Sequence, residues 1–265
     1  MPGRRHQDPS RAGQVAMAKE WEQKLAGLGL NRGSYVTVLT GAGVSAESGV
    51  PTFRGEDGLW KNYAAEELAT PQAFAANPGL VWEWYDWRRG IVAGTEPNPA
   101  HYAITDLEKL FDRFLLITQN VDGLHRRAGT RNLVELHGYI FGVRCVAEGK
   151  VMENLEVPLP SIPPLCDCGA MLRPDIVWFG EALPERAIMK AMEASSASDL
   201  MLVAGTSAVV QPAASMPLLA KEAGAFVMEI NPDPTPISPF VDITLQGKAG
   251  DVLPEVVAAI SGLIS

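Results

Sequence analysis

A glycine-rich turn, Gly41-Ala42-Gly43, carries the residue types that most directly indicate chemistry in this sequence. A β-branched run from Tyr35 to Thr40 precedes it, and a short helical start at Val44 to Ser48 follows it. Such a strand, turn and helix cradle a pyrophosphate, because glycine lets the backbone approach the phosphates and the free N–H groups of the helix start face their charge. Gly41, Gly43 and Ala46 also match the G-x-G-x-x-G/A spacing, so the turn predicts a dinucleotide site.

The chemistry expected for this dinucleotide differs from that of a nicotinamide dehydrogenase. Such an enzyme carries an acidic residue about 20 residues after the glycine turn, at the end of a second strand, where it binds the ribose. Glu56, Asp57 and Glu66 lie near that distance, but the sequence from Arg54 to Trp60 is typical of a glycine-rich loop. The same cofactor is therefore expected with another reaction.

Short apolar runs alternate with helical patterns along the chain, which predicts an α/β fold with a doubly wound, Rossmann-like parallel sheet. The expected strands are Val36–Thr40, Phe114–Thr118, Leu200–Gly205, Phe226–Ile230 and Ile243–Leu245. The expected helices lie at about 14–29, 98–111, 185–197, 213–223 and 251–262. Because ligands bind at the carboxyl ends of such strands, the polar loops after them should converge on one crevice.

Two segments interrupt this alternation and predict a smaller lobe inserted in the main domain. Residues from about 55 to 95 are aromatic and helical in pattern. Residues from about 139 to 180 contain all three cysteines and a proline-rich piece at 157–164, which we interpret as a surface connector. Residues 1–13 are expected to form a flexible tail, and 14–265 a single domain that includes both inserts.

The composition disfavours several classes of protein. The chain has 265 residues, of which 47% are hydrophobic and 20% charged, so it can form a large core. Its formal net charge of −9 disfavours a nucleic-acid partner, and no apolar run approaches the ~20 residues that cross a bilayer. Three cysteines do not indicate a disulfide framework, so a cytoplasmic location without membrane or nucleic-acid partners is expected.

Seven sequence blocks, in order along the chain, together resemble the sirtuins, which are NAD-dependent protein lysine deacylases. The blocks are Gly41-Ala42-Gly43-Val44-Ser45, Gly49-Val50-Pro51-Thr52-Phe53-Arg54, Thr118-Gln119-Asn120-Val121-Asp122-Gly123-Leu124-His125, Glu135-Leu136-His137-Gly138, Pro174-Asp175-Ile176-Val177-Trp178-Phe179-Gly180-Glu181, Gly205-Thr206-Ser207 and Asn231-Pro232. Tyr85-x-x-Arg88 further resembles the pair that marks the class III branch, whose members remove succinyl and malonyl groups. The resemblance implies NAD as cofactor and acylated-lysine proteins or peptides as partners.

The resemblance also implies a reaction in which the acyl-lysine carbonyl oxygen attacks the anomeric carbon of the nicotinamide ribose as nicotinamide leaves. His137 is the candidate general base that helps to deprotonate a ribose hydroxyl, since an imidazole with a pKa near ~6.5 accepts a proton near neutral pH. The resemblance implies that Asn120 and Asp122 bind nicotinamide and that Gln119 binds the ribose. The expected products are free lysine, nicotinamide and O-acyl-ADP-ribose.

These catalytic candidates have structural alternatives. His137 could be a satisfied, buried histidine that caps a loop, and Asn120 and Asp122 could serve in loop or helix capping. We expect His101 and His125 to be structural.

Further cofactor-binding residues are implied at the glycine turn, in the loop after it and at the later strand ends. The full set is Gly41, Ala42, Gly43, Ser45, Ser48, Pro51, Thr52, Phe53, Arg54, Trp60, Gln119, Asn120, Asp122, Gly205, Thr206, Ser207, Asn231, Asp233 and Ala249. Phe53 and Arg54 lie on what the family uses as a mobile cofactor loop, and the later strand ends would bind the adenosine half. As an alternative, Thr206 and Ser207 would be helix N-caps.

Tyr85 and Arg88 would lie three residues apart on one face of a helix. A phenol and a guanidinium there can pair with the carboxylate of an acyl chain, and the guanidinium can do so through two hydrogen bonds. The alternative is an exposed helix on which Arg88 pairs with Glu83 or Asp86.

One further segment resembles the strand along which the family binds its substrate peptide, and it comprises Val177, Trp178 and Phe179. The alternative is that this segment is a core strand.

The cysteines depart from the family pattern, in which two Cys-x-x-Cys pairs hold a structural zinc. Here the pairs read Cys145-x-x-Glu148 and Cys166-Asp167-Cys168, so one thiolate is missing and the second spacing is short. Glu148 or Asp167 could supply an oxygen, but structural zinc sites prefer thiolate or imidazole ligands. Zinc at the three cysteines is therefore uncertain, and no residue is assigned as a metal ligand. Without metal, the lobe would be held by packing of Leu155, Val157, Leu159, Ile162 and Leu165.

The sequence thus predicts an NAD-dependent deacylase for succinyl and malonyl groups, with deacetylation as a second activity. Three alternatives stay open. The chain could be a general deacetylase in which Tyr85 and Arg88 have no selective role, a mono-ADP-ribosyltransferase, or a non-catalytic NAD-binding module.

Overall fold

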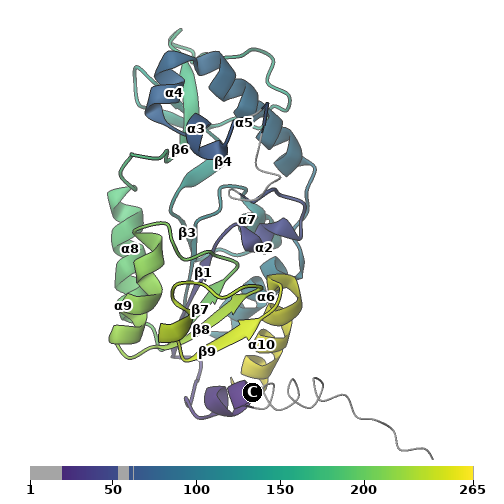
Figure 1. The fold of residues 1–265 in the computed structure, drawn as a ribbon, viewed down its shortest axis with the longest axis vertical. Helices are drawn as coiled ribbons and strands as arrows, with labels where there is room; N and C mark the ends of the chain where they lie inside the picture. The colour runs from purple at the N-terminus through teal and green to yellow at the C-terminus, as the bar shows by residue number, and fades with distance from the viewer. Residues whose placement is uncertain (1–19, 53–59, 62, 265) are drawn as a thin grey trace, which may run out of the picture.

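The structure, a computed structural model, describes residues 20–52, 60–61 and 63–264 (Figure 1). The tail expected at 1–13 and the cofactor-loop residues Phe53 and Arg54 lie outside these ranges. The molecule is elongated, and a small sheet with its helices lies at one end of a larger sheet (Figure 1). Within the described ranges, none of the helices is both long and apolar enough to span a bilayer.

The larger sheet is parallel, and its strand order is β3-β2-β1-β7-β8-β9. Its strands are β1 (Tyr35–Thr40), β2 (Arg113–Thr118), β3 (Leu133–Glu135), β7 (Leu200–Ala204), β8 (Phe226–Asn231) and β9 (Ile243–Gln246). The order reverses at β1, and such a switch point opens a crevice at the carboxyl ends of the strands. The expected Rossmann-like sheet is confirmed. The sequence does not predict β3, because three residues are too short a pattern.

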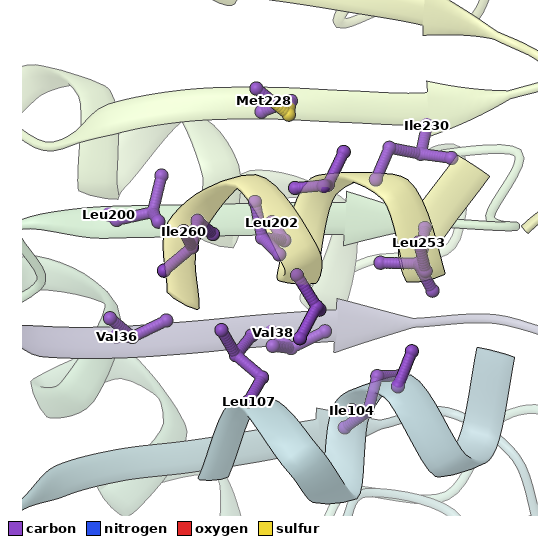
Figure 2. Packing of buried hydrophobic residues seen from close by; sticks show 14 of the residues in the cluster. Val36, Val38, Ile104, Leu107, Leu200, Leu202, Met228, Ile230, Leu253 and Ile260 are labelled. Atoms are coloured by element: carbon purple, nitrogen blue, oxygen red, sulfur yellow. The ribbon is translucent and has the colours of Figure 1, made fainter. Parts of the chain in front are cut away.

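Helices cover both faces of the parallel sheet (Figure 1). One face packs against α6 (Pro99–Leu110) and α10 (Ala249–Ile264), and the other against α8 (Glu185–Ser196) and α9 (Met216–Glu222). Side chains alternate along β1, so Val36 and Val38 pack under α6 and α10 (Figure 2), whereas Leu39 belongs to the opposite face. Short 3-10 turns, η2 (Ala213–Ser215) and η3 (Ser238–Phe240), precede α9 and β9.

The smaller sheet is antiparallel and has the order β5-β4-β6. Its strands are β4 (Gly138–Cys145), β5 (Val151–Glu153) and β6 (Leu172–Ile176), and its helices are α3 (Ala65–Leu68), α4 (Pro71–Ala76) and α5 (Pro78–Ala93). Trp82 and Trp84 of α5 share one buried cluster with Ile140 and Val143 of β4. Both segments that interrupt the alternation therefore contribute to a second core, although the sequence pattern does not predict a sheet there.

The chain between β5 and β6 does not hold this part together as expected. Leu155 and Leu165 are each 63% exposed and Ile162 is 39% exposed, whereas Leu159 is buried. The expectation is wrong for these three exposed residues, because β4, β6 and α5 already supply the apolar side chains of the core.

Two short helices, α2 (Gly43–Ala46) and α7 (Leu124–Ala128), lie between the two sheets (Figure 1). Gly138, which begins β4 beside them, passes very close to β6. A Cβ atom at this position would lie 2.1 Å from the carbonyl oxygen of Asp175. The backbone φ of Gly138 is also +89°, in the left-handed region that favours glycine. The close pairing of β4 with β6 therefore requires glycine here.

Gly138→Ala should lower the free energy of unfolding by about 2–4 kcal/mol, because it adds a steric clash to the cost of a left-handed backbone. Gly224→Ala is the matched control, since φ is +98° there and no described atom lies within 4 Å of the added Cβ position. The control should lose about 1–2 kcal/mol. Urea unfolding measures both variants, and equal losses would contradict the close contact at Gly138.

Candidate active site

Loops from neighbouring strands meet at the carboxyl edge of the parallel sheet. The turn after β1 contacts the loop after β7, since the Gly43 N–H donates to the Gly205 carbonyl over 2.8 Å. The loop after β2 joins them, because the Gln119 side-chain amide donates to Thr206 Oγ1 over 3.0 Å. The Gly205 N–H in turn donates to the carbonyl of Ile230 in β8. The structure therefore brings together sequence blocks that lie far apart along the chain.

The glycine turn is built differently from the expected phosphate cradle. A Cβ atom on Gly41 or Gly43 would lie 2.8 Å from the Gly205 carbonyl oxygen, so these glycines are needed for contact between two protein loops. The N–H groups of residues 43–46 all donate to carbonyls of Gly205, Gly41 or Ala42. The expectation of free N–H groups at the helix start is wrong for these residues, because α2 is a single turn that closes on itself.

The His137 side chain is oriented by the loop after β2. Its Nδ1 lies 2.9 Å from the Gln119 carbonyl oxygen. A carbonyl only accepts, so Nδ1 carries the proton and Nε2 has the lone pair. Burial lowers the pKa of His137 below its ordinary 6.5, and the bond to Gln119 raises it in part. The ring is therefore neutral at pH 7, with one nitrogen able to accept a proton.

Asn120 and Asp122 are both buried, and both contact Ser45 of α2. Asn120 Nδ2 donates to Ser45 Oγ over 3.1 Å, and the Ser45 hydroxyl bonds to Asp122. Asp122 Oδ1 also accepts the Leu124 N–H over 2.8 Å in the loop that leads into α7, although the N-cap of α7 is Gly123. Burial raises the pKa of Asp122, while the bonds from Leu124 and Ser45 lower it. Both side chains are thus oriented by the fold itself.

Two buried histidines, His101 and His125, pack next to these residues. His101 Nε2 lies 3.4 Å from Ser45 Oγ, and its ring centroid is 4.7 Å from that of His125. His125 Nε2 in turn lies 3.1 Å from Thr40 Oγ1 at the end of β1. Both histidines are buried and contact other residues of the chain, which agrees with the structural role expected of them. Sequence reasoning missed that His101 reaches the Ser45–Asn120 pair, because 56 residues separate His101 from Ser45.

Tyr85 and Trp178 connect α5 to the segment after β6. The Tyr85 hydroxyl accepts a hydrogen bond from Trp178 Nε1 over 2.9 Å. Tyr85 is 2% exposed, and burial raises its pKa, so the phenol stays protonated at neutral pH. Its hydroxyl proton can therefore be donated to an acceptor.

Arg88, one turn further along α5, is 8% exposed. The alternative of an exposed helical ion pair is wrong, since Glu83 binds Lys61 and Asp86 accepts the Leu159 N–H. Burial lowers the pKa of Arg88, whereas electrostatic interactions with Tyr85 and Asp122 raise it. The guanidinium, which remains protonated at neutral pH, thus lies within electrostatic range of both groups.

The expected peptide segment follows β6 rather than lying in a strand, so the core-strand alternative is wrong. The N–H groups of residues 177–179 all donate within the chain, to the His137 carbonyl, Glu181 Oε2 and the Ala69 carbonyl. The Arg173 guanidinium lies 3.6 Å from the Trp178 ring centroid and binds Glu181. Sequence reasoning missed this brace. A peptide that pairs with the segment would have to donate to its carbonyl groups.

The other expected cofactor residues line the strand ends in different ways. Thr206 accepts the Ala208 N–H in a turn. Among the described residues no helix begins between Thr206 and η2, so its N-cap alternative is wrong. Ser207 is exposed, and Asn231 Nδ2 donates to the Asp233 carbonyl over 2.7 Å.

The remaining expected cofactor residues lie near α2, α5 and α10. Ser48 Oγ accepts a bond from Asn98, and Pro51 and Thr52 are half-buried. Trp60 lies against Trp87 of α5, with 6.4 Å between ring centroids. Ala249 begins α10, where the Gly250 N–H donates to the Glu47 carboxylate.

The cysteines form a cluster in the smaller sheet. The sulfur atoms of Cys145, Cys166 and Cys168 and a carboxylate oxygen of Glu148 all lie within 4.8 Å of one another. Thiolates are favoured zinc ligands, and a carboxylate oxygen also binds zinc. The donor set therefore fits the structural zinc that the resemblance implies. Such an ion would hold two turns of the smaller sheet together and take no part in proton transfer.

Comparisons with known proteins agree with this arrangement. The Sir2 family profile matches residues 41–212. The chain is 57% identical over 224 residues to "NAD-dependent protein deacylase 2" of Pyrobaculum aerophilum, covering 84% of this chain and 90% of that protein. It is 54% identical to "NAD-dependent protein deacylase" of Aquifex aeolicus, covering 83% of this chain and 93% of that protein.

Solved structures give the same result. The fold is similar to that in a crystal structure of a Sir2 homologue–NAD complex, with a TM-score of 0.85, 49% identity, and coverage of 93% of this chain and 95% of that one. It is also similar to that in a complex of Sir2 with a p53 peptide and NAD⁺, with a TM-score of 0.79, 32% identity, and coverage of 93% and 99%.

The buried histidine beneath the site predicts an acid-dependent loss of stability. Burial lowers the pKa of His101 to about 4 in the folded state, against an ordinary value of 6.5. As the pH falls, the histidine binds a proton in the unfolded chain before it does so in the folded one. The stability that the neutral ring contributes is therefore present above pH 6.5 and is lost as the pH falls toward 4. At pH 5 the loss should be about 2 kcal/mol.

Urea unfolding at pH 7 and pH 5 measures this loss. His101→Gln, which removes the titrating ring, should show a correspondingly smaller difference between the two pH values. The same pH dependence in the variant and the wild type would contradict the neutral, buried state of His101.

Proposed function

Because the chain belongs to the Sir2 family and is an NAD-dependent protein deacylase, we propose that it prefers lysines whose acyl group ends in a carboxylate, such as succinyl-lysine and malonyl-lysine. The observation that supports this preference is the burial of Arg88, 8% exposed, one turn from Tyr85 on α5. A carboxylate is the anion that a guanidinium binds through two parallel hydrogen bonds. An acetyl group offers no such anion.

The surroundings of Arg88 suit an acidic acyl chain. The guanidinium carbon lies 5.3 Å from the Trp84 ring centroid, and Tyr85 presents a neutral hydroxyl nearby. Aromatic rings exclude water from the methylene groups of a succinyl chain, and the low dielectric of a buried site strengthens the pairing of its carboxylate. The proposed acyl pocket thus combines an apolar wall with two hydrogen-bond donors.

The electrostatic coupling of Arg88 to Asp122 supports a pocket that adjoins the reacting groups. When bound, NAD would supply an anomeric carbon with nicotinamide as leaving group. We assign Asn120 and Asp122, which Ser45 orients, to the binding of nicotinamide, and Gln119 to the ribose. Glycine-turn and later strand-end residues would bind the rest of the dinucleotide.

His137 would act as the general base through Nε2. The Gln119 carbonyl holds the proton on Nδ1, so the free lone pair can accept the proton of a ribose hydroxyl. Once the ring is protonated, the bond from Nδ1 to the carbonyl becomes charge-assisted and stabilises the imidazolium. The chain would release free lysine, nicotinamide and O-acyl-ADP-ribose.

A second role for Arg88 is favoured by its coupling to Asp122. In that case Arg88 would be a counter-ion of the nicotinamide site, and the enzyme would be a general deacetylase. The two roles differ in their consequences, because loss of a counter-ion impairs the reaction of every acyl group, whereas loss of an acyl-carboxylate partner impairs only acidic ones.

Arg88→Met should lower kcat/KM for a succinyl-lysine peptide roughly 10-fold to 100-fold, the effect of losing a hydrogen bond to a charged group of about 1.5–3 kcal/mol. The acetyl version of the same peptide should be deacylated at nearly the wild-type rate. Arg88→Lys is the matched control and should be intermediate on the succinyl peptide, since it keeps the charge without the two-bond geometry. Equal losses on both peptides would establish the counter-ion role and contradict the proposed preference.

The kcat/KM of the wild type should fall on the acid side with a midpoint below pH 6.5, because burial lowers the pKa of His137 and only the neutral ring accepts a proton. His137→Gln should lose most activity, and its residual rate should lack this acidic limb. A pH profile on one succinyl peptide tests both points. A midpoint well above pH 7 would be inconsistent with His137 as a buried, neutral base.

A further inference from the structure

We propose that the Glu148 carboxylate is the fourth ligand of a zinc ion whose other three ligands are the thiolates of Cys145, Cys166 and Cys168. In the Cys-x-x-Cys pattern that the chain resembles, a cysteine would stand at position 148. This zinc site would lie in the smaller sheet alone, and it is independent of the acyl preference proposed above.

The distances between the donor atoms suit a tetrahedral ion. Zinc–sulfur bonds of about 2.3 Å and zinc–oxygen bonds of about 2.1 Å place neighbouring ligand atoms roughly 3.6–3.8 Å apart. Cys145 Sγ and Cys168 Sγ are 3.5 Å apart, and Cys166 Sγ and Glu148 Oε2 are 3.9 Å apart. The sulfurs of Cys145 and Cys168 are well beyond the roughly 2.05 Å of a disulfide bond.

Two tight turns form the cluster. In the first, which follows β4, the Gly149 N–H donates to the Cys145 carbonyl, and the Glu148 N–H points at Cys145 Sγ over 3.4 Å. In the second, the Gly169 N–H donates to the Cys166 carbonyl. N–H groups directed at sulfur stabilise thiolate, as hydrogen bonds around metal ligands commonly do. The turns therefore place the four donors by backbone geometry.

The structure also distinguishes between the two carboxylates of the cluster region. Glu148 follows Cys145 at the spacing of a ligand pair, and its carboxylate faces the sulfur of the second turn. Asp167 stands between Cys166 and Cys168, and it does not belong to the group of donors within 4.8 Å. Glu148 is therefore the oxygen ligand, and Asp167 is not.

A carboxylate in this position changes the properties of the site. Zinc is selected by soft thiolates, whereas carboxylates suit harder cations, so three thiolates and one carboxylate should hold zinc more weakly than four thiolates. Cys168 is exposed, which gives chelators access to the ion. We therefore expect stoichiometric but exchangeable zinc in this protein.

The test compares the full-length wild type with Glu148→Gln, Glu148→Cys and Asp167→Asn. Competition with a chromophoric chelator measures zinc affinity. Glu148→Gln should weaken binding at least about tenfold, since even changes outside the ligand shell have effects of that size. Glu148→Cys should tighten binding, and Asp167→Asn, the matched control, should leave it unchanged. Circular dichroism of each variant confirms that the chain is folded.

Cobalt substitution counts the thiolates directly. The near-ultraviolet sulfur-to-cobalt absorbance grows with the number of bound thiolates, so the wild type, with three cysteines, should show about three quarters of the Glu148→Cys intensity. Weakened binding in Asp167→Asn but not in Glu148→Gln would overturn the assignment. So would equal cobalt spectra in the wild type and Glu148→Cys, or a purified chain without zinc in which Cys145 and Cys168 are disulfide-bonded.

Discussion

The hydrogen bond from His137 Nδ1 to the Gln119 carbonyl is the interaction on which the proposed chemistry depends. Gln119 stands where three strand ends meet. Its backbone N–H donates to the Thr40 carbonyl at the end of β1, and its side chain donates to Thr206 after β7. The same residue that joins the loops at the switch point of the sheet therefore also sets the tautomer of the base. Displacing either loop would change the protonation pattern of His137 as well as the shape of the crevice.

The candidate site lies between two hydrophobic cores, and each core positions different residues of the site. The parallel sheet and its helices form the first core, and Asn120 and Asp122, in the loop after β2, contact Ser45. The antiparallel sheet and α5 form the second core, and they carry Arg88 as a buried charge. Within this second core, β4 passes so close to β6 at Gly138 that no room is left for a side chain.

Sequence patterns predict the regular parts of this molecule well. A single sequence suffices to predict the alternating strands and helices, the order of the blocks and the position of His137, because these are local or family features. It does not predict the contact of His101 with Ser45, the contact of Arg173 with Trp178 or the exposure of Leu155. These features depend on how distant segments of the chain pack together. The contact of Gly41 with the loop after β7 is also non-local, since the glycine pattern alone does not reveal which loop lies beside it.

The most direct test of this account is mass spectrometry of the products formed from a succinyl-lysine peptide with and without NAD. The account predicts free lysine peptide, nicotinamide and O-succinyl-ADP-ribose in equal amounts, and only when NAD is present. Removal of the succinyl group without NAD, or NAD left intact while the peptide stays succinylated, would contradict it.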